Sequence, residues 1–296
     1  MILELGFDVV REKTDKEIDT ALLGKTSKIN TTTLPRSPVV CIMGHVDHGK
    51  TTLLDNLRTA NVAASEAGGI TQRLSAFVVD MKGKSTVFLD TPGHAAFTAM
   101  RSYGASATDL VILVVAIDDG VRPQTVEALR IAKEANASII IALNKVDKII
   151  DVSDRAKARA RVLNELAEVD LISEDFGGEV PVVEVSGKSG IGIPDLIETI
   201  QLQADILELA ASYSGPAEAM VLDAVVEKGR GVVADLLVQW GELRVGDIIV
   251  VGTSYGKVKA ILNDKGKTLK CKQKKIFYII LKIFTFIFVF IFYLYI

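Results

Sequence analysis

The feature that most constrains this chain is the segment Gly44 to Thr51, which reads GHVDHGKT and matches the pattern GxxxxGK[ST]. A β-branched run at 39–43 precedes it, and helical spacing follows over 50–59. Glycines let the backbone wrap around phosphate oxygens with its N–H groups pointing inward, and the helix N-terminus adds partial positive charge. Lys50 can then reach the β and γ phosphates of a nucleotide, while the Thr51 hydroxyl can bind Mg²⁺. The segment predicts a phosphate-binding loop between a strand and a helix.

Strands and helices alternate for about 170 residues around this loop, which predicts a P-loop NTPase domain with a doubly wound, mostly parallel α/β sheet. The continuous apolar run at 110–117 is typical of a central strand buried on both faces. After residue 216 the pattern changes to strands separated by glycine turns, which predicts the start of a small β-barrel. Strands are expected at 39–43, 76–80, 85–90, 110–117, 138–143, 180–185, 220–226, 232–240, 247–251 and 257–262, and helices at 50–59, 123–136, 155–169 and 194–209.

Composition narrows the class of protein further. Apolar residues make up 49% and charged residues 24% of the 296 positions, as in globular proteins. The net charge of −3 excludes a protein that coats nucleic acid by charge alone. The two cysteines, Cys41 and Cys271, exclude a disulfide scaffold and favour a reducing compartment.

A second motif, DTPGH at 90–94, directly follows an expected strand. An aspartate at a strand end, here Asp90, can hold Mg²⁺ through water. Gly93 can bring its N–H close to a γ-phosphate, where a side chain would block the approach. His94 comes next and can orient an attacking water. A lone histidine is more often structural, so its position after DxxG is what makes His94 the predicted catalytic residue.

A third motif, NKVD, follows the strand expected at 138–143 and comprises Asn144, Lys145 and Asp147. One carboxylate can accept hydrogen bonds from both N1–H and the exocyclic amine of guanine. Adenine offers no such pair of donors, and binding it would leave a buried carboxylate unpaired. The motif alone is compatible with an ordinary polar loop; behind the first two motifs it predicts guanine selectivity.

Two weaker signals complete the set. Thr71, in the loop between the first two motifs, can contact Mg²⁺ and γ-phosphate only in the triphosphate state. The segment 186–188 follows the last expected strand, where its backbone can contact the base. The predicted metal-associated residues are Thr51, Thr71 and Asp90. The predicted nucleotide-binding residues are Gly44, His45, Val46, Asp47, His48, Gly49, Lys50, Thr51, Thr52, Thr71, Asp90, Gly93, Asn144, Lys145, Asp147, Ser186, Gly187 and Lys188. In this order the motifs predict a GTPase that uses GTP, GDP and Mg²⁺.

Other interpretations of these residues are less favoured. His45, Asp47 and His48 could suggest zinc, but a phosphate-binding loop turns its N–H groups inward and leaves the side chains without convergence. The basic run at 155–161 spreads around a helix, which favours a solvated surface over an RNA contact. Cys41 is expected to be an inert core residue.

The segments GHVDHGKT, AGGITQ, DTPGHAAFTAMR, DDGVRPQT and NKVD resemble the translational GTPases, most closely bacterial-type translation initiation factor 2. The resemblance covers about residues 36 to 270, and the stretch 229–267 resembles the start of that family's β-barrel second domain. It implies that Val46 and Ile70 form a hydrophobic gate beside His94, and that Lys145 lies along the base plane. It also implies a ribosome-stimulated GTPase that promotes initiator tRNA placement and subunit joining. Arg73 stands where the family usually has His, and Gly187 where it usually has Ala.

The expected domain organisation is a linker or remnant of an upstream domain at 1–37, a GTP-binding domain at 38–210, a partial β-barrel at 217–270 and a hydrophobic tail at 271–296. The family's domain that holds initiator tRNA is absent, so a truncated product is expected. Residues 276–296 of the tail are long enough to span a bilayer. Phe, Ile, Tyr, Lys and Leu dominate this stretch, and these amino acids have codons built only of A and T, which favours translated non-coding sequence over a membrane anchor. Such a tail hints at a eukaryotic organelle, mitochondrion or plastid, with bacterial cytoplasm as the alternative. The alternative function is a membrane-attached or non-functional remnant that binds nucleotide without ribosomes.

Overall fold

The computed structural model describes residues 33–58, 75–81, 83–91, 104–228, 231–252, 254–262 and 280–288. The chain divides into two compact units, Met1–Thr33 and Leu34–Ile296, and the fold described below belongs to the second. Thr71, Gly93 and His94, together with Ile70 and Arg73, lie outside the described residues.

The first sheet has six strands in the order β3-β4-β2-β5-β6-β7. All neighbouring pairs are parallel except β3 and β4, which form an antiparallel hairpin around Gly83. The expected mostly parallel sheet is therefore confirmed. Its strands are β2 (Val39–Gly44), β3 (Ser75–Met81), β4 (Lys84–Asp90), β5 (Leu110–Ala116), β6 (Ser138–Asn144) and β7 (Val182–Glu184).

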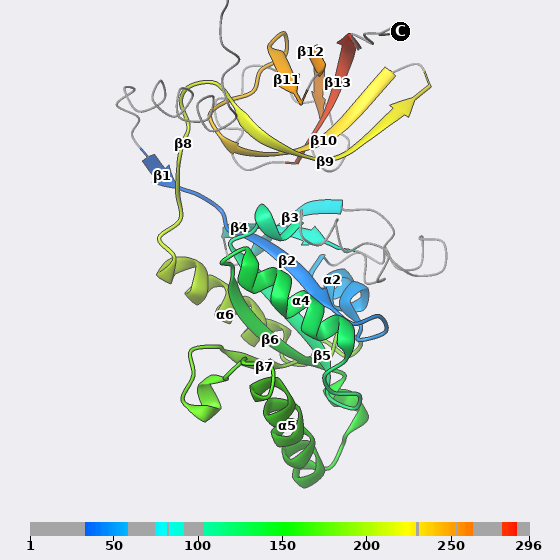
Figure 1. The fold of residues 1–296 in the computed structure, drawn as a ribbon, viewed down its shortest axis with the longest axis vertical. Coiled ribbons are helices and arrows are strands. Elements are labelled where there is room, and N and C mark those ends of the chain that lie inside the picture. Colours follow the sequence, from blue (N-terminus) through cyan, green and yellow to red (C-terminus); the bar gives the residue numbers. More distant parts are fainter. Residues whose placement is uncertain are drawn as a thin grey trace, which may run out of the picture. The chain divides into compact units, whose positions relative to one another are not determined.

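Helices lie on both faces of this sheet (Figure 1). Helix α2 (Lys50–Arg58) follows β2 and precedes β3, whereas α4 (Pro123–Glu134) joins the neighbouring parallel strands β5 and β6. Two further helices are α5 (Val152–Ala167) and α6 (Ile193–Ile206). Among the described residues, no helix is long and apolar enough to cross a membrane.

The core of the sheet is built from strands that are apolar on both faces. All seven residues of β5 are buried, and so are all six of β2. The strand β2 lies between β4 and β5 in parallel register, with Ile42 opposite Asp90 and Gly44 opposite Val114. This register brings the carboxyl ends of β2, β4, β5 and β6 to one edge, where three of the sequence motifs follow.

A second, antiparallel sheet has the strand order β11-β12-β13-β10-β9. Four of its strands were expected from the sequence. The fifth comes from the hydrophobic tail and pairs with β10 on one side and with β12 on the other. The strands are β9 (Glu218–Glu227), β10 (Gly231–Trp240), β11 (Ile248–Val251), β12 (Ser254–Leu262) and β13 (Ile280–Phe288). The pairing gives part of the tail a place in this sheet; whether the tail is translated non-coding sequence stays a prediction.

Short elements and helix ends differ from the sequence expectation. Helix α5 begins at Val152 and not at residue 155, because the Asp151 carboxylate accepts hydrogen bonds from the backbone N–H groups of Ser153 and Asp154 (2.8 and 3.2 Å) and caps an earlier start. A two-stranded sheet of β1 (Thr33–Pro35) and β8 (Ala210–Ser212) was not expected. Two 3₁₀ helices, Val146–Lys148 and Glu174–Phe176, were also missed.

Candidate nucleotide-binding site

The loop after β2 can form only with glycine at its two ends. Gly44 has φ +146°, and a Cβ there would lie 2.3 Å from the Val114 carbonyl oxygen. Gly49 has φ +83°, and its Cβ would lie 2.5 Å from the Asn144 side chain. Asp47 between them is also left-handed, at φ +62°. The backbone is thus held in the curled shape that directs N–H groups towards a bound anion.

Lys50 lies buried beneath this loop. Its ammonium donates hydrogen bonds to the carbonyl oxygens of Gly44 and His45, at 3.0 and 2.7 Å. The cation is therefore already placed inside the curl of the loop, where phosphate oxygens can take the place of the carbonyl partners. The geometry fits a polyphosphate, whose charge needs a cation at this position.

Asn144 joins the first and third motifs. Its side-chain amide donates to the His48 carbonyl oxygen (2.8 Å), and its oxygen accepts from the backbone N–H of Gly187 (3.0 Å) and of Lys145 (2.8 Å). One buried side chain thus ties together the phosphate loop, the NKVD segment and the segment at 186–188. The three sequence signals meet in space at the carboxyl edge of the sheet.

Asp147 and Ser186 complete the base side of the site. The Ser186 hydroxyl donates to Asp147 Oδ1 at 2.6 Å and accepts from the Ser189 N–H at 3.0 Å. Lys145 has φ +66°, which turns the chain sharply between Asn144 and Asp147. A Cβ on Gly187 would lie 2.9 Å from the Leu53 N, so this segment packs closely against α2. These contacts fix the position of one Asp147 carboxylate oxygen and of the segment at 186–188, next to where a planar base would bind.

The second motif is described only at its start. Asp90 is buried at the end of β4, and the neighbouring Thr91 hydroxyl donates to the Ile42 carbonyl oxygen at 2.9 Å. Asp90 thus lies beside the strand that leads into the phosphate loop, as a magnesium-associated carboxylate requires. Burial raises the pKa of the nearby Cys41 thiol far above its usual range, which keeps this core cysteine protonated and unreactive.

His48 makes a contact that the sequence motifs did not reveal. Its ring is buried against the loop after β5, with Nε2 3.0 Å from Asp119 Oδ2 and Nδ1 3.3 Å from the Ala116 backbone N. Because the Ala116 N–H donates to Nδ1, the proton of the neutral ring resides on Nε2 and faces Asp119. Burial lowers the pKa of His48, and the hydrogen bond to Asp119 opposes that shift only in part. The His48 side chain therefore links the phosphate loop to the loop after β5.

Comparison with known proteins shows the family to which the chain belongs. The model of the family described as Elongation factor Tu GTP binding domain matches residues 35–205, more than half of the chain. The chain belongs to this family. A second model, Elongation factor G domain 2, matches residues 216–271. Residues 35–205, which match the first family, are called the G domain below.

Curated relatives carry the name Translation initiation factor IF-2. Those from Carboxydothermus hydrogenoformans and Buchnera aphidicola subsp. Schizaphis graminum are 51% and 49% identical to this chain over 90% of its length. The chain spans only 31% and 30% of those two relatives. Among solved structures, GDP-bound aIF5B from Aeropyrum pernix is similar at a TM-score of 0.69 and 31% identity, covering 85% of this chain and 52% of that one. A bacterial selenocysteine-specific elongation factor, EF-Sec, is similar at a TM-score of 0.68 and 27% identity, covering 84% of this chain and 42% of that one.

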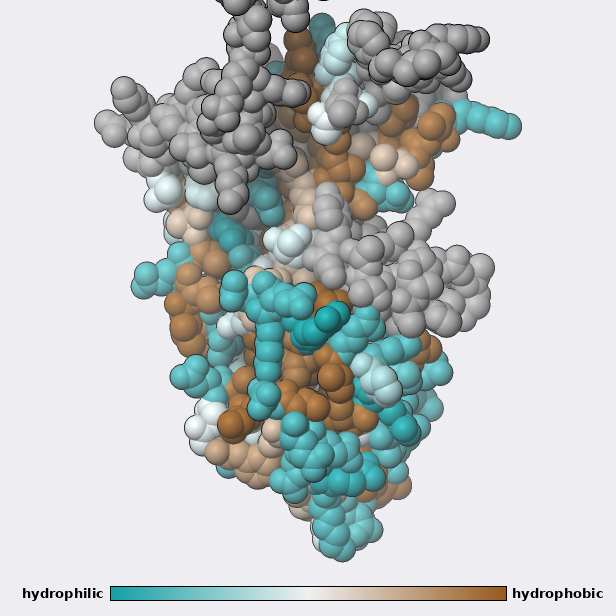
Figure 2. Space-filling model, viewed as in Figure 1, coloured by the Kyte–Doolittle hydropathy of each residue, from teal (hydrophilic) through white to brown (hydrophobic). Residues whose placement is uncertain are grey.

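The basic run on α5 of the G domain is occupied by local partners. Arg155 donates to the Ile149 carbonyl oxygen, Lys157 pairs with Asp154, and Arg159 pairs with Asp175. Arg161 donates to the carbonyl oxygens of residues 117 and 118 and so supports the loop after β5. Figure 2 shows hydrophilic residues gathered at the end of the view where α5 lies in Figure 1. The run is a solvated surface that also braces the site.

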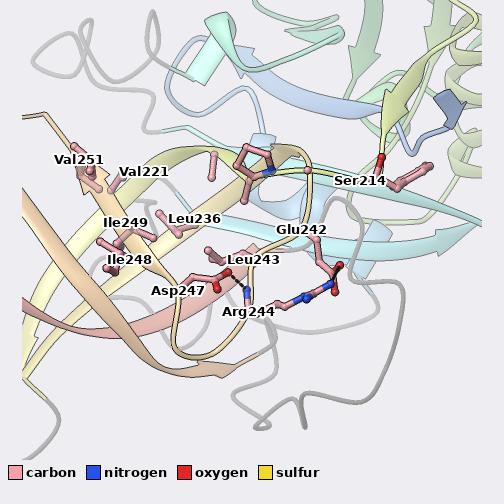
Figure 3. A pocket seen from close by; sticks show the side chains of 16 residues that line it. Ser214, Val221, Leu236, Glu242, Leu243, Arg244, Asp247, Ile248, Ile249 and Val251 are labelled. Atoms are coloured by element: carbon pink, nitrogen blue, oxygen red, sulfur yellow. Dashed lines mark hydrogen bonds and ion pairs between the residues drawn. The ribbon is translucent and has the colours of Figure 1, made fainter. Parts of the chain in front are cut away.

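A pocket of about 760 Å³ lies outside the G domain, along the second sheet (Figure 3). Val221, Leu236 and Leu243 form part of its apolar wall. At its rim the Arg244 guanidinium pairs with Glu242 (2.8 Å), and the Arg244 N–H donates to Asp247 (2.7 Å). None of the residues that line it belongs to the nucleotide motifs, so the candidate nucleotide site is a separate surface.

Proposed function

We propose that this chain binds GTP and GDP with Mg²⁺ and hydrolyses GTP, as the GTPase part of a translation initiation factor. The observation that carries the proposal is Asn144, which joins the phosphate loop to both segments that would hold the base. Guanine is the base that suits Asp147, because a single carboxylate can accept its two neighbouring N–H groups. The names of the curated relatives support the assignment to initiation.

Each residue has a defined task in this proposal. Lys50 binds the β and γ phosphates and neutralises charge that develops as the bond to the γ-phosphorus breaks. Thr51, Thr71 and Asp90, the last through water, would hold Mg²⁺, which supplies positive charge beside the phosphates. His94 orients the water whose oxygen forms the new bond to phosphorus, and GDP leaves with the bridging oxygen. Val46 and Ile70 shield His94 from bulk water.

The wider role follows from the family resemblance and the relatives. Ribosomes of the bacterial type are the proposed partner and stimulate hydrolysis, which promotes initiator tRNA placement and subunit joining. We assign contact with the tRNA itself to parts of the factor outside this chain, which spans 31% of the relative from Carboxydothermus hydrogenoformans. The proposed location is a compartment that contains such ribosomes.

Displacement of a fluorescent GDP analogue from the full chain tests nucleotide selection. We expect GTP to displace the analogue and ATP to require about 100-fold higher concentration, because ATP leaves the Asp147 carboxylate without its donors. Removal of Mg²⁺ with a chelator should weaken binding. Equal displacement by ATP and GTP would contradict the proposal.

Hydrolysis is tested separately by phosphate release in a single turnover with bacterial ribosomes. The His94→Ala variant should bind GTP almost as the unmodified chain does and hydrolyse it about 100-fold more slowly, as expected when a positioning group is lost. An unchanged rate would move the catalytic role to another residue.

A further inference from the structure

The first turn of α4 contacts the phosphate loop at two points that the nucleotide motifs do not include. The Gln124 side-chain oxygen accepts a hydrogen bond from the Val46 backbone N–H at 3.0 Å. The His48 ring binds Asp119, whose other oxygen pairs with the Arg122 guanidinium at the N-cap of α4. Two neighbouring segments, 119–122 and the start of α4, thus hold residues 46 and 48 of the loop.

Helix α4 is a firm base for such contacts. Pro123 occupies its first position, and the Thr125 hydroxyl oxygen accepts a hydrogen bond from the Arg122 backbone N–H at 3.4 Å. Ala128, Leu129 and Ala132 on the same helix are buried in the core that contains β2 and β5. Since the helix is fixed at both its cap and its apolar face, the position of Gln124 is set by packing and not by the loop.

The Val46 N–H donates its hydrogen bond to Gln124, so Gln124 is the partner of this donor in the structure. Val46 itself is only half-buried, and without Gln124 the amide would have water as its alternative partner. The loop also contains a left-handed residue, Asp47, directly after Val46. A loop with such a backbone keeps a single shape only when its surroundings hold it there.

We propose that Gln124 is a positioning residue that clamps the phosphate loop through the Val46 amide and thereby slows nucleotide release. The inference rests on the proposed binding of GTP and GDP. When the clamp is absent, the loop samples further conformations, and only the fraction with the binding shape retains nucleotide. Asp119 also holds the loop in its binding shape, through its hydrogen bond to the His48 ring. Gln124 itself touches the backbone of the loop and takes no part in the chemistry.

The test compares Gln124→Met with Arg130→Met in the full chain. Methionine keeps the length of glutamine but lacks its oxygen acceptor, and Arg130 is an exposed residue on the same helix with a single long ion pair to Glu134. Dissociation of a fluorescent GDP analogue is followed after mixing with excess GDP. We expect release to be about tenfold faster from the Gln124 variant and unchanged from the Arg130 variant, since one hydrogen bond contributes about that factor.

Hydrogen exchange of the Val46 amide in the nucleotide-free chain provides a second, independent readout. Exchange should be faster in the Gln124→Met variant, while the amides of α4 from residue 128 onward keep their protection. Equal release rates for the two variants, or unchanged exchange at Val46, would overturn the clamp. Failure of the unmodified chain to bind GDP would instead contradict the proposed function, and the exchange measurement would still decide the contact. Should the methionine variant not fold, Gln124→Ala is measured in the same way.

Discussion

The strands β5 and β11 have nearly the same apolar composition and opposite surroundings. All seven residues of β5 are buried, whereas Ile248 and Val250 of β11 are 76% and 75% exposed. The first strand lies inside a parallel sheet with helices on both faces, and the second is an edge strand of an antiparallel sheet. An apolar run therefore indicates a strand, but its position in the sheet decides whether its side chains stabilise the fold.

The two regions also differ in what their polar groups do. In the G domain, Asn144 and His48 are buried and join segments that are far apart in the sequence. Between β10 and β11 of the second sheet, at the rim of an open pocket, the Arg244 guanidinium pairs with Glu242 and the Arg244 backbone N–H donates to Asp247. Buried polar networks fix one arrangement of loops, while pairs at the surface contribute little to specificity.

The largest expected contrast is in stability. Leu113→Ala in β5 removes a fully buried side chain and should lower the free energy of unfolding by about 2–5 kcal/mol. Ile248→Ala in β11 should change it by less than about 0.5 kcal/mol, because that side chain is mostly in water already. Urea denaturation followed by circular dichroism measures both. Similar losses for the two variants would show that β11 is covered in solution.

Two glycines offer the next contrast. Gly44→Ala places a Cβ against the Val114 carbonyl oxygen, which cannot move without breaking the sheet, and should cost about 2–4 kcal/mol. Gly246→Ala, at φ +101°, meets nothing within 4 Å and should cost only the backbone strain, about 1 kcal/mol. The same denaturation experiment compares them. If Gly246→Ala lowers the free energy of unfolding more than Gly44→Ala does, the backbone at Gly246 is the more constrained of the two.

Substitutions at two aspartates test whether the nucleotide site and the pocket of the second sheet are independent. Asp147→Asn replaces one acceptor oxygen by a donor and should weaken GDP binding about 100-fold, or about 2.7 kcal/mol, while binding of xanthine nucleotides improves. The contact of Asp147 with Ser186 can survive, since the amide oxygen still accepts a hydrogen bond. Asp247→Asn is the matched control and should leave GDP binding unchanged. An equal loss from both variants would argue against a separate guanine site.

The smallest expected effect is a difference in pH dependence. Burial lowers the pKa of His48 in the folded chain, so below pH 6.5 the unfolded chain takes up the proton more readily and stability falls as the pH falls. One group changes the free energy by at most about 1.4 kcal/mol per pH unit. The His48→Gln variant should show a shallower slope between pH 7.5 and 5.5.

The second sheet supplies the control for this pH experiment. The Arg244 guanidinium lowers the pKa of Glu242 below its usual 4.5, so this carboxylate stays ionised in both states over the same range. Its stabilising charge is lost only as the pH falls through that lowered pKa. Glu242→Gln should therefore leave the slope between pH 7.5 and 5.5 unchanged. If stability depends on pH equally in the His48→Gln variant and in the unmodified chain, His48 is not the group responsible for the loss of stability at low pH.

The sequence predicted the parallel sheet and the meeting of its motifs well, because each depends on a local pattern. The apolar run at 110–117 and the strand before GHVDHGKT appear as β5 and β2, almost within their expected bounds. The sequence did not predict Gln124 or Asp119 as part of the site. Glutamine at the start of a helix has many uses, and no spacing rule connects it to a loop 78 residues earlier.

The sequence by itself determined where phosphate and guanine contacts are expected, since glycine positions and strand ends follow from the conformations that the backbone allows locally. Only the tertiary structure decided that the His48 ring binds Asp119, that Gln124 holds the Val46 amide, and that residues 280–288 pair between β10 and β12. These contacts join segments that approach one another only after the sheets have formed. Their partners are chosen by packing across the fold, which a local pattern of residues does not record.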